Sequence, residues 1–172
     1  EVVRIIVKTV YGIWRLPDRG IWEIRNEEKH FVFSKVMCWV ALDRGVRVAS
    51  YLKQPDYEVA WRKEADKIKE DIMLNGWNEE IQSFTQSYDS THADSSLLLM
   101  AQYGFIEPTD LRFINTVHRI RKELYHEGLM YRYRNRDDFG HPTSAFTICT
   151  FWLIQALHEI GDKEEAKEIF DE

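Results

Sequence analysis

The sequence predicts an all-α fold built from helical hairpins. Apolar residues recur at helical spacing over most of the chain, the segments between them are long and irregular, and β-branched runs are short. No exact repeat is visible, but the order helix, long loop, helix is typical of stacked helical hairpins. An open solenoid and a closed ring of paired helices both produce this order. A solenoid usually has tight turns and a repeating signature, and this sequence has neither.

The first half of the chain contains three expected helices. Residues 1–10 are β-branched enough for a strand, but their apolar positions have helical spacing, so we expect a helix. The segment 31–52 carries an apolar stripe at i, i+3, i+4 and i+7, which predicts a long helix. Pro55 then supplies a start signal for a second long helix, which Asn75 and Gly76 end.

The second half contains shorter elements. Asp94 can cap a short apolar helix that ends near Gly104, and the segment 108–128 opens with Pro-Thr-Asp and continues as a helix with one apolar face. Residues 144–160 form a further helix, rich in Phe and Trp. A capping-box pattern at 162–165 starts a last amphipathic helix. Strand content is expected to be minor.

Length and composition set limits on the fold and on the partners. The 172 residues, taken as 1–172, fit one domain, and 44% hydrophobic with 30% charged residues is typical of a globular protein. The formal net charge of −6 gives no general attraction for nucleic acid or for an anionic membrane surface. We therefore expect neither partner. No apolar run approaches the roughly 20 residues that span a bilayer.

Two further features bear on location. Arg4 and Lys8 interrupt the apolar N-terminus, so nothing there marks export. Cys38 and Cys149 are far apart and have bulky apolar neighbours, which favours reduced thiols over a disulfide framework. A cytoplasmic protein is the expectation.

Residues 17–25, within the loop 16–30, are the most unusual stretch of the sequence. In it Glu23 stands between Trp22 and Ile24, with Arg25 two positions further on, just before a long helix. Apolar neighbours desolvate a carboxylate and favour its protonated form, which a general acid near neutral pH requires. The alternative is an ion pair of Glu23 with Arg25 or Arg19 at the helix entry, as is common for solvated loop charges.

Several stretches resemble glycoside hydrolase family 15, the glucoamylase and trehalase family. The most specific is Gly20-Ile21-Trp22-Glu23 followed by Ser34-Lys35, and the resemblance extends from about residue 14 to 170. The other matching stretches, in the family's order, are 37–44, 94–98, 104–106, 128–133 and 146–153. The form of residues 34–41 looks most like the prokaryotic branch, which contains trehalases and glucan hydrolases.

The resemblance implies a fold, a reaction and a set of site residues. The fold would be part of an α/α toroid of six-hairpin glycosidase type, and the reaction would be exo-acting hydrolysis of an α-glucosidic bond with inversion, without a metal or organic cofactor. Glu23 would be the general acid. Trp22 would border the sugar site and offer its indole face to a glucose ring. Arg132 and Tyr133 match an Arg-Tyr pair that contacts the non-reducing glucose.

Three more residues follow the acid closely and are expected to line the substrate site: Arg25, His30 and Lys35. Each also has a plainer interpretation, His30 as a surface group at the helix start and Lys35 as a solvated helix charge. Arg132 could likewise be an exposed residue of a short extended segment. The aromatic residues on apolar helical stripes are expected to be core rather than sugar platforms: Trp39, Phe151 and Trp152.

The sequence departs from the family's pattern at the second carboxylate. Inversion needs a general base about 6.5–9.5 Å from the acid, and the family's base lies in a later Ser-Glu segment that no residue here matches. Glu27, Glu28 and Asp89 are acidic but have no other feature of a base. The expectation is a catalytic fragment that is inactive in isolation, with trehalose and maltooligosaccharides both open as substrates.

A different class of function also fits these observations. The chain could be a non-catalytic helical module that binds carbohydrate or protein and keeps the hairpins without the chemistry. Apolar stripes left exposed on an incomplete ring would promote self-association, so a homo-oligomer is possible. The six histidines show no metal-binding spacing, and no metal site is expected.

Overall fold

The computed structural model describes residues 1–25 and 27–171. The described helices are α1 (Val2–Ile13), α2 (Val32–Tyr51), α3 (Pro55–Asn75), α4 (Leu111–Leu124), α5 (Thr147–Ile160) and α6 (Lys163–Asp171), with a 3-10 helix, η1, at Ser95–Leu99. Two antiparallel hairpins pair β1 (Trp77–Asn78) with β2 (Ser83–Phe84), and β3 (Tyr125–His126) with β4 (Leu129–Met130). Trp77 lies opposite Phe84, and Tyr125 lies opposite Met130. The predicted all-α class is confirmed, including the helix at the N-terminus.

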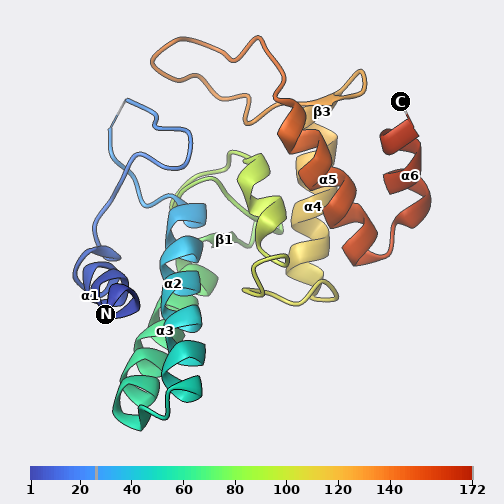
Figure 1. Ribbon diagram of the computed structural model, residues 1–172. Coiled ribbons are helices and arrows are strands. Elements are labelled where there is room, and N and C mark those ends of the chain that lie inside the picture. Colours follow the sequence, from blue (N-terminus) through green and yellow to red (C-terminus); the bar gives the residue numbers. More distant parts are fainter. Residues whose placement is uncertain (26, 172) are drawn as a thin grey trace.

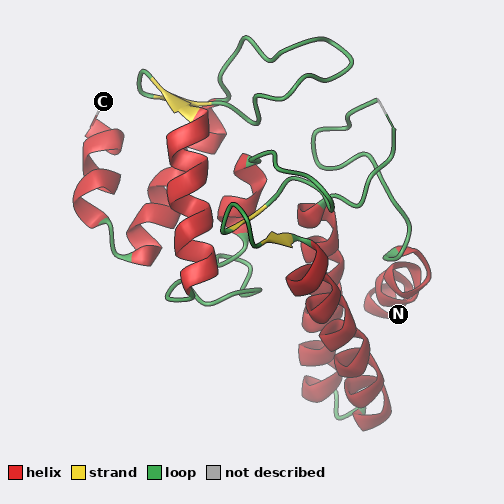
Figure 2. Ribbon diagram, turned by 180° about the vertical axis from the view of Figure 1, so that it is seen from behind, coloured by secondary structure: helices red, strands yellow, loops and turns green. Residues whose placement is uncertain are grey.

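The helices form two groups joined by a shared core. α2 and α3 run antiparallel as a long pair with α1 against α2, while η1, α4, α5 and α6 pack together beside them (Figure 1). The loops before α2, after β2 and before α5 all lie toward one end of the molecule, as the view from behind also shows (Figure 2). The long irregular segments of the sequence therefore share one end of the fold.

Local signals in the sequence fix the helix ends. Pro55 occupies the first turn of α3, where a missing N–H costs nothing, and acidic side chains follow it in that turn. Asp94 caps η1 and Asp110 caps α4, each by accepting a hydrogen bond from the backbone N–H two residues on. Gly161 ends α5 with a φ of 104°, a left-handed conformation that glycine adopts without strain.

Three predicted boundaries are wrong. The helix expected over 108–128 ends at Leu124, because Glu127 and Gly128 both have positive φ and form the two-residue turn of the β3–β4 hairpin. The helix expected from 144 begins at Thr147. The helix expected from Asp94 to near Gly104 is a five-residue 3-10 helix that ends at Leu99 and is followed by turns.

The core is one large apolar cluster that reaches from α1 to α6, with a small second cluster under the loops. Residues from every helix contribute to the large cluster. Ile24, Phe31 and Tyr133 make up the second, and Trp22 packs against it. Glu64 on α3 is a buried carboxylate, which accepts a hydrogen bond from the indole of Trp14 at the C-terminal end of α1. The apolar packing thus continues to the end of the molecule where the loops meet.

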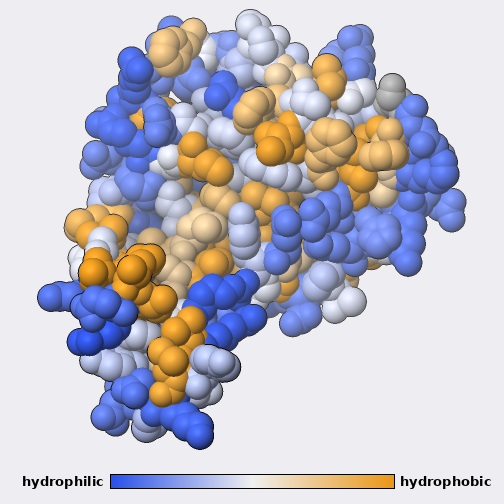
Figure 3. Space-filling model, in the orientation of Figure 1, coloured by the Kyte–Doolittle hydropathy of each residue, from blue (hydrophilic) through white to orange (hydrophobic). Residues whose placement is uncertain are grey.

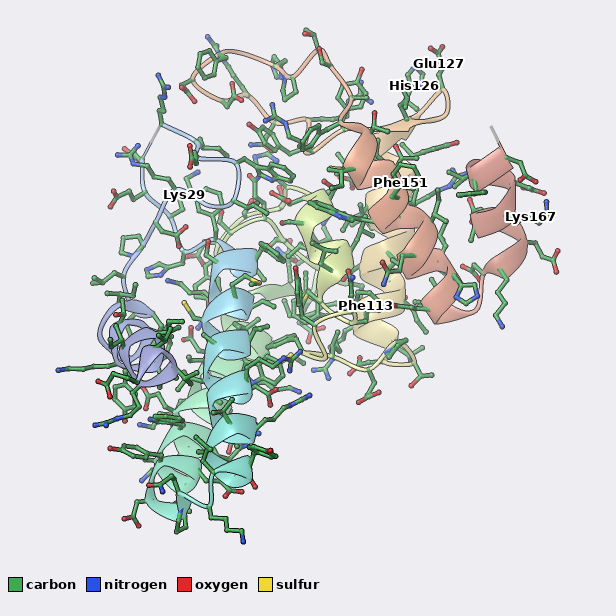
Figure 4. All side chains as sticks on the ribbon, viewed as in Figure 1. Lys29, Phe113, His126, Glu127, Phe151 and Lys167 are labelled. Atoms are coloured by element: carbon green, nitrogen blue, oxygen red, sulfur yellow. The ribbon has the colours of Figure 1, made fainter. Side chains whose placement is uncertain are left out.

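The surface carries several apolar residues, and no described helix is long and apolar enough to cross a membrane. Apolar side chains gather over α1 and around the start of α5 (Figure 3). Phe151, expected in the core, is 55% exposed on α5 (Figure 4), whereas Trp39 is buried. An apolar residue on a helical stripe is core only if another element covers it, and nothing among the described residues covers Phe151.

Candidate functional site

The candidate site lies where three loops are joined by backbone hydrogen bonds. The loop 14–31 meets the loop after β2, because Val32 donates to the Gln86 carbonyl at 3.0 Å and Tyr88 donates to the His30 carbonyl at 3.0 Å. The loop 131–146 meets the start of η1, where Ser95 donates to the Arg132 carbonyl at 2.9 Å. Segments far apart in the sequence are therefore held together at one end of the fold.

The start of α2 holds the loop that carries Glu23. One oxygen of Asp18 accepts from the Gly20 amide at 2.6 Å and from the Ser34 hydroxyl at 2.8 Å. The ammonium of Lys35 donates to the Leu16 carbonyl. Gly20 has a φ of 69°, and a Cβ there would lie 3.0 Å from the ring of Phe31. The Ser-Lys pair at 34–35 and the glycine at 20 thus fix a single path for this loop.

Glu23 itself is exposed and has a φ of 52°. Its backbone N–H donates to the Gly20 carbonyl at 3.2 Å, and the next amide, of Ile24, donates to the Arg19 carbonyl at 3.0 Å. This turn buries Ile24 and directs Trp22 toward the other loops. The described residues do not enclose the Glu23 side chain in an apolar wall, contrary to the expectation from its neighbours in sequence.

Trp22 lies at the centre of an aromatic cluster. Its ring centroid is 6.1 Å from those of Phe146 and Trp152 and 6.5 Å from that of Tyr133. The guanidinium of Arg132 lies over the indole at 5.6 Å. Trp22 is half-buried, so part of its ring remains accessible beside a cation, an arrangement that suits a polar ligand with apolar C–H faces.

Arg132 and Tyr133 share this corner but have different environments. Arg132 is half-buried, and its guanidinium lies 5.6 Å from the ring centre of Tyr133. Tyr133 is buried and donates to an Asp137 oxygen at 2.6 Å. Burial, together with the hydrogen bond to that carboxylate, raises the pKa of Tyr133 above its ordinary value. Tyr133 is therefore a neutral donor that supports the loop, and Arg132 is the polar group that remains accessible.

A cavity of about 220 Å³ opens beside Arg132 in the same loop. Its other lining residues are Asp137, Phe139, His141, Pro142, Thr143 and Ser144. The cavity has an arginine at one end and hydroxyl, imidazole and carboxylate groups around it, which are groups that can bind sugar hydroxyls.

The other predicted site residues have protein partners of their own. Arg25 is exposed, its amide donates to Asp138 at 3.3 Å, and its guanidinium lies 5.7 Å from the ring of Phe139. His30 stacks on Tyr88 with ring centroids 5.4 Å apart. Arg25 thus links the two long loops, and His30 packs against the loop after β2.

Lys35 has neither of its expected environments. It is only 2% exposed, so it is not a solvated helix charge, and its ammonium is occupied by the Leu16 carbonyl. Burial lowers the pKa of Lys35, although the nearby Asp18 acts in the opposite direction. Lys35 therefore supports the loop that carries Glu23 through its bond to the Leu16 carbonyl.

Reasoning from the sequence missed Asp94, Phe146 and Trp152 as members of the site. Asp94 is buried and accepts from the indole N–H of Trp22, which lies 3.0 Å from both carboxylate oxygens. The sequence identifies Asp94 as a helix cap, a role that it also has, and as part of a stretch that resembles the family, but gives it no role in the site. Trp152 lies on an apolar stripe of α5, and no sequence signal separates a stripe residue that faces the core from one that borders a site.

Within the described residues, 1–25 and 27–171, no group of three or more His, Cys, Asp or Glu side chains could hold a metal ion. Of the acidic residues considered for a base, Glu28 lies 3.6 Å from Arg19 in an exposed ion pair, and Glu27 and Asp89 are exposed. The arrangement on which a function can be argued is the contact of the Trp22 indole with Arg132, one residue before the exposed Glu23.

Comparison with known proteins identifies the family. The model of glycosyl hydrolases family 15 matches residues 1–172. A trehalase from Mycobacterium tuberculosis is 47% identical over 159 residues, which are 91% of this chain and 23% of that protein. A trehalase from Thermoplasma volcanium is 34% identical over 171 residues, 99% of this chain and 27% of that protein. The chain thus spans about a quarter of the length of these relatives.

Solved structures share the fold at lower identity. The structure of a glycosidase variant in complex with glucose matches with a TM-score of 0.79 at 19% identity. The match covers 93% of this chain and 42% of the glycosidase chain. A glucoamylase from Saccharomycopsis fibuligera has a TM-score of 0.71 at 12% identity, over 87% of this chain and 36% of its own. These likenesses confirm the predicted helical-toroid fold class. With a family model that matches its whole length, the chain belongs to glycosyl hydrolases family 15.

Proposed function

We propose that this chain is the acid-bearing part of an inverting, exo-acting α-glucosidase, with Glu23 as the general acid that protonates the glycosidic oxygen. One observation carries the proposal: Trp22, the neighbour of Glu23 in the family's motif, packs beside Tyr133 and under the guanidinium of Arg132. Predicted site residues from two distant parts of the sequence thus meet beside the turn that carries Glu23. The chain's membership of family 15 supports the same roles.

We infer that trehalose is the first substrate to test, with maltooligosaccharides second. Both relatives compared above by sequence are named as trehalases, whereas the structural likeness extends to a glucoamylase. The half-buried indole of Trp22 would contact the C–H face of the non-reducing glucose, and Arg132 would bind its hydroxyls. Arg25, His30 and Lys35 would act on the loops rather than on the sugar, because each has another partner.

The 172 residues alone are proposed to be inactive. None of them resembles the family's general base, and inversion needs that second carboxylate to activate water. A cytoplasmic location and the absence of cofactors remain part of this proposal. The free thiols of Cys38 and Cys149 are compatible with a reducing compartment.

The test is Glu23→Gln in the longest natural protein that contains this chain. We expect glucose release to fall by at least about a hundredfold, the usual contribution of a general acid. Circular dichroism should stay unchanged, because Glu23 is exposed. Retained activity would contradict the assignment of Glu23. Glucose binding without hydrolysis by the wild-type protein would instead identify the non-catalytic carbohydrate-binding module.

A further inference from the structure

The short segment Asp94-Ser95-Ser96 contacts both residues proposed to bind the sugar. Asp94 accepts from the indole of Trp22 at 3.0 Å. The next residue, Ser95, donates to the carbonyl of Arg132 through its amide at 2.9 Å and through its hydroxyl at 3.0 Å. Trp22 and Arg132 come from different loops, so consecutive residues of one rigid segment fix their positions relative to each other.

Asp94 is built into the fold more firmly than an ordinary helix cap. It is 3% exposed and accepts from the Ser96 amide at 2.9 Å, the Ser96 hydroxyl at 2.6 Å and the Gln86 amide nitrogen at 2.9 Å, besides the indole. A cap needs only the first of these bonds. Of the additional donors, Gln86 and the Ser96 hydroxyl belong to the stretch that contains Asp94, and the Trp22 indole comes from the loop 14–31, so the carboxylate joins two distant chain segments.

The indole bond restricts the orientation of Trp22. The aromatic contacts of Trp22 with Phe146 and Trp152 are tilted or edge-on, and such contacts tolerate rotation of the ring. A hydrogen bond from Nε1 to a buried acceptor is directional, so it selects one ring orientation. With the ring fixed, the half-buried indole keeps its place 5.6 Å from the Arg132 guanidinium.

We propose that Asp94 is a positioning residue that sets the affinity for the non-reducing glucose by holding the indole of Trp22 beside Arg132. This inference rests on the proposed function, in which Trp22 and Arg132 contact the sugar. Asp94 touches neither the sugar nor the scissile bond. Its loss should therefore weaken binding more than it slows the chemical step.

The orientation of Trp22 can be tested without activity, in the 172-residue chain labelled with ¹⁵N. Six tryptophans give six indole N–H signals in a heteronuclear NMR spectrum, and Trp22→Phe identifies the signal of Trp22. We expect Asp94→Asn to move this signal toward the position of a free indole and to speed its exchange with solvent. An unchanged Trp22 signal in Asp94→Asn would overturn the proposal.

The chain offers a matched control in a second indole–carboxylate pair. Trp14 donates to Glu64 at 2.8 Å, and Glu64 is also buried. Trp14 lies at the C-terminal end of α1, eight residues before Trp22, and among the described residues this pair has no hydrogen bond to Trp22, Asp94 or Arg132. Glu64→Gln should move the signal of Trp14 and leave that of Trp22 in place. This control shows whether the effects of Asp94→Asn come from the Trp22–Asp94 bond itself or would follow from weakening any buried indole–carboxylate bond.

Steady-state kinetics on trehalose test the consequence for affinity, in the longest natural protein that contains this chain. Asp94→Asn should raise KM about tenfold, within the range of a charge-assisted hydrogen bond, and change kcat by less than about threefold. Glu64→Gln should leave KM unchanged. In a Trp22→Phe background, Asp94→Asn should change KM by less than about twofold, because the bond is already absent.

The outcomes separate this proposal from the function on which it rests. An active wild-type protein whose KM is the same in Asp94→Asn would overturn the positioning role alone. Equal KM increases from Asp94→Asn and Glu64→Gln would also overturn it, because the effect would then be general destabilisation. A wild-type protein without hydrolytic activity would overturn the proposed function and, with it, the effect on affinity.

Discussion

At the scale of single residues, the loop that carries Glu23 depends on one glycine. Gly20 combines a φ of 69° with a Cβ position 3.0 Å from the Phe31 ring. Gly20→Ala should lower the free energy of unfolding by about 2 kcal/mol, from backbone strain and displacement of the ring. Urea denaturation measures this loss.

Gly12 in α1 is the control for this substitution. No atom lies within 4 Å of its Cβ position, and it is helical and exposed. Gly12→Ala should therefore raise the stability by up to about 1 kcal/mol. Equal effects of the two substitutions would contradict the strain assigned to Gly20.

We expect Glu64 to account for much of the loss of folding stability at acidic pH, here called the acid limb. Burial disfavours its ionised form, but hydrogen bonds from Lys67, Trp14 and Arg15 outweigh this and lower the pKa of Glu64 to about 2. A lowered carboxyl pKa stabilises the fold above the unfolded value of 4.5, and this contribution is lost as the pH falls from 4.5 toward 2.

Unfolding free energies measured between pH 6 and pH 2 test this assignment. The wild-type chain should lose about 2–3 kcal/mol through Glu64 over that interval. Glu64→Gln should be less stable at pH 6 and should have a flatter acid limb. The same acid limb in both proteins would show that another carboxylate is responsible.

The site residues differed in how far the sequence could predict them. Trp22, Glu23 and Arg132 are in short specific motifs, so their resemblance to a family was visible without a structure. Asp94 is predicted as a cap and as part of a family-like stretch, but its role in the site is not predictable, because its bond to Trp22 joins residues 72 positions apart and depends on how two loops meet. Lys35 looked like a surface charge because helical spacing does not show that the loop 14–31 folds over it.

At the scale of elements, the start of α2 supports the loop before it. Lys35 and Ser34 bind the Leu16 carbonyl and Asp18, and the rest of α2 is anchored in the core. Lys35→Met keeps the aliphatic volume but removes the donor. Amide exchange should become faster in the loop 14–25, while the secondary structure content stays the same.

Hydrogen exchange read by mass spectrometry measures this effect, and Lys63→Met on the exposed side of α3 is the control. The control should leave exchange in the loop 14–25 unchanged. Identical exchange in the wild type and Lys35→Met would show that the ammonium does not hold the loop.

Element existence was predictable and element ends were less so. The bounds of the long helices α2 and α3 are predicted to within one residue. Both have strong apolar periodicity, and Pro55 and Gly76 mark the start and the end of α3. The end of α4 was missed because the apolar pattern continues past Leu124 into the β3–β4 hairpin. The sequence predicts Gly128 as the end of a helix, but it is the second residue of the β3–β4 hairpin turn. A single glycine suits both a helix end and a hairpin turn, so it does not distinguish them.

At the scale of the whole molecule, apolar residues remain uncovered on α1. Its exposed large apolar side chains are Val2, Ile5, Ile6, Tyr11 and Ile13. Contiguous exposed apolar surface promotes association, so the isolated 172-residue chain should self-associate with rising concentration in sedimentation velocity. Ile5→Glu should weaken the association, whereas Leu111→Glu on α4 should not. A chain that stays monomeric at every concentration would contradict this role of α1.

The toroid class followed from the resemblance rather than from periodicity. Helical spacing and long loops left both a solenoid and a ring open, because the closure of a ring depends on contacts among many helices. The stretches that resemble the family lie both in loops, as at 20–23, and in helices, as at 37–44 in α2, and together they decide between the two.

The central claim is inverting hydrolysis with Glu23 as the acid, and proton NMR of the first products from trehalose tests it most directly. The longest natural protein that contains this chain should release α- and β-glucose in equal amounts before mutarotation, because only the attacked glucose inverts its configuration. Glu23→Gln should release neither. Exclusive release of α-glucose, or normal release by Glu23→Gln, would contradict the claim.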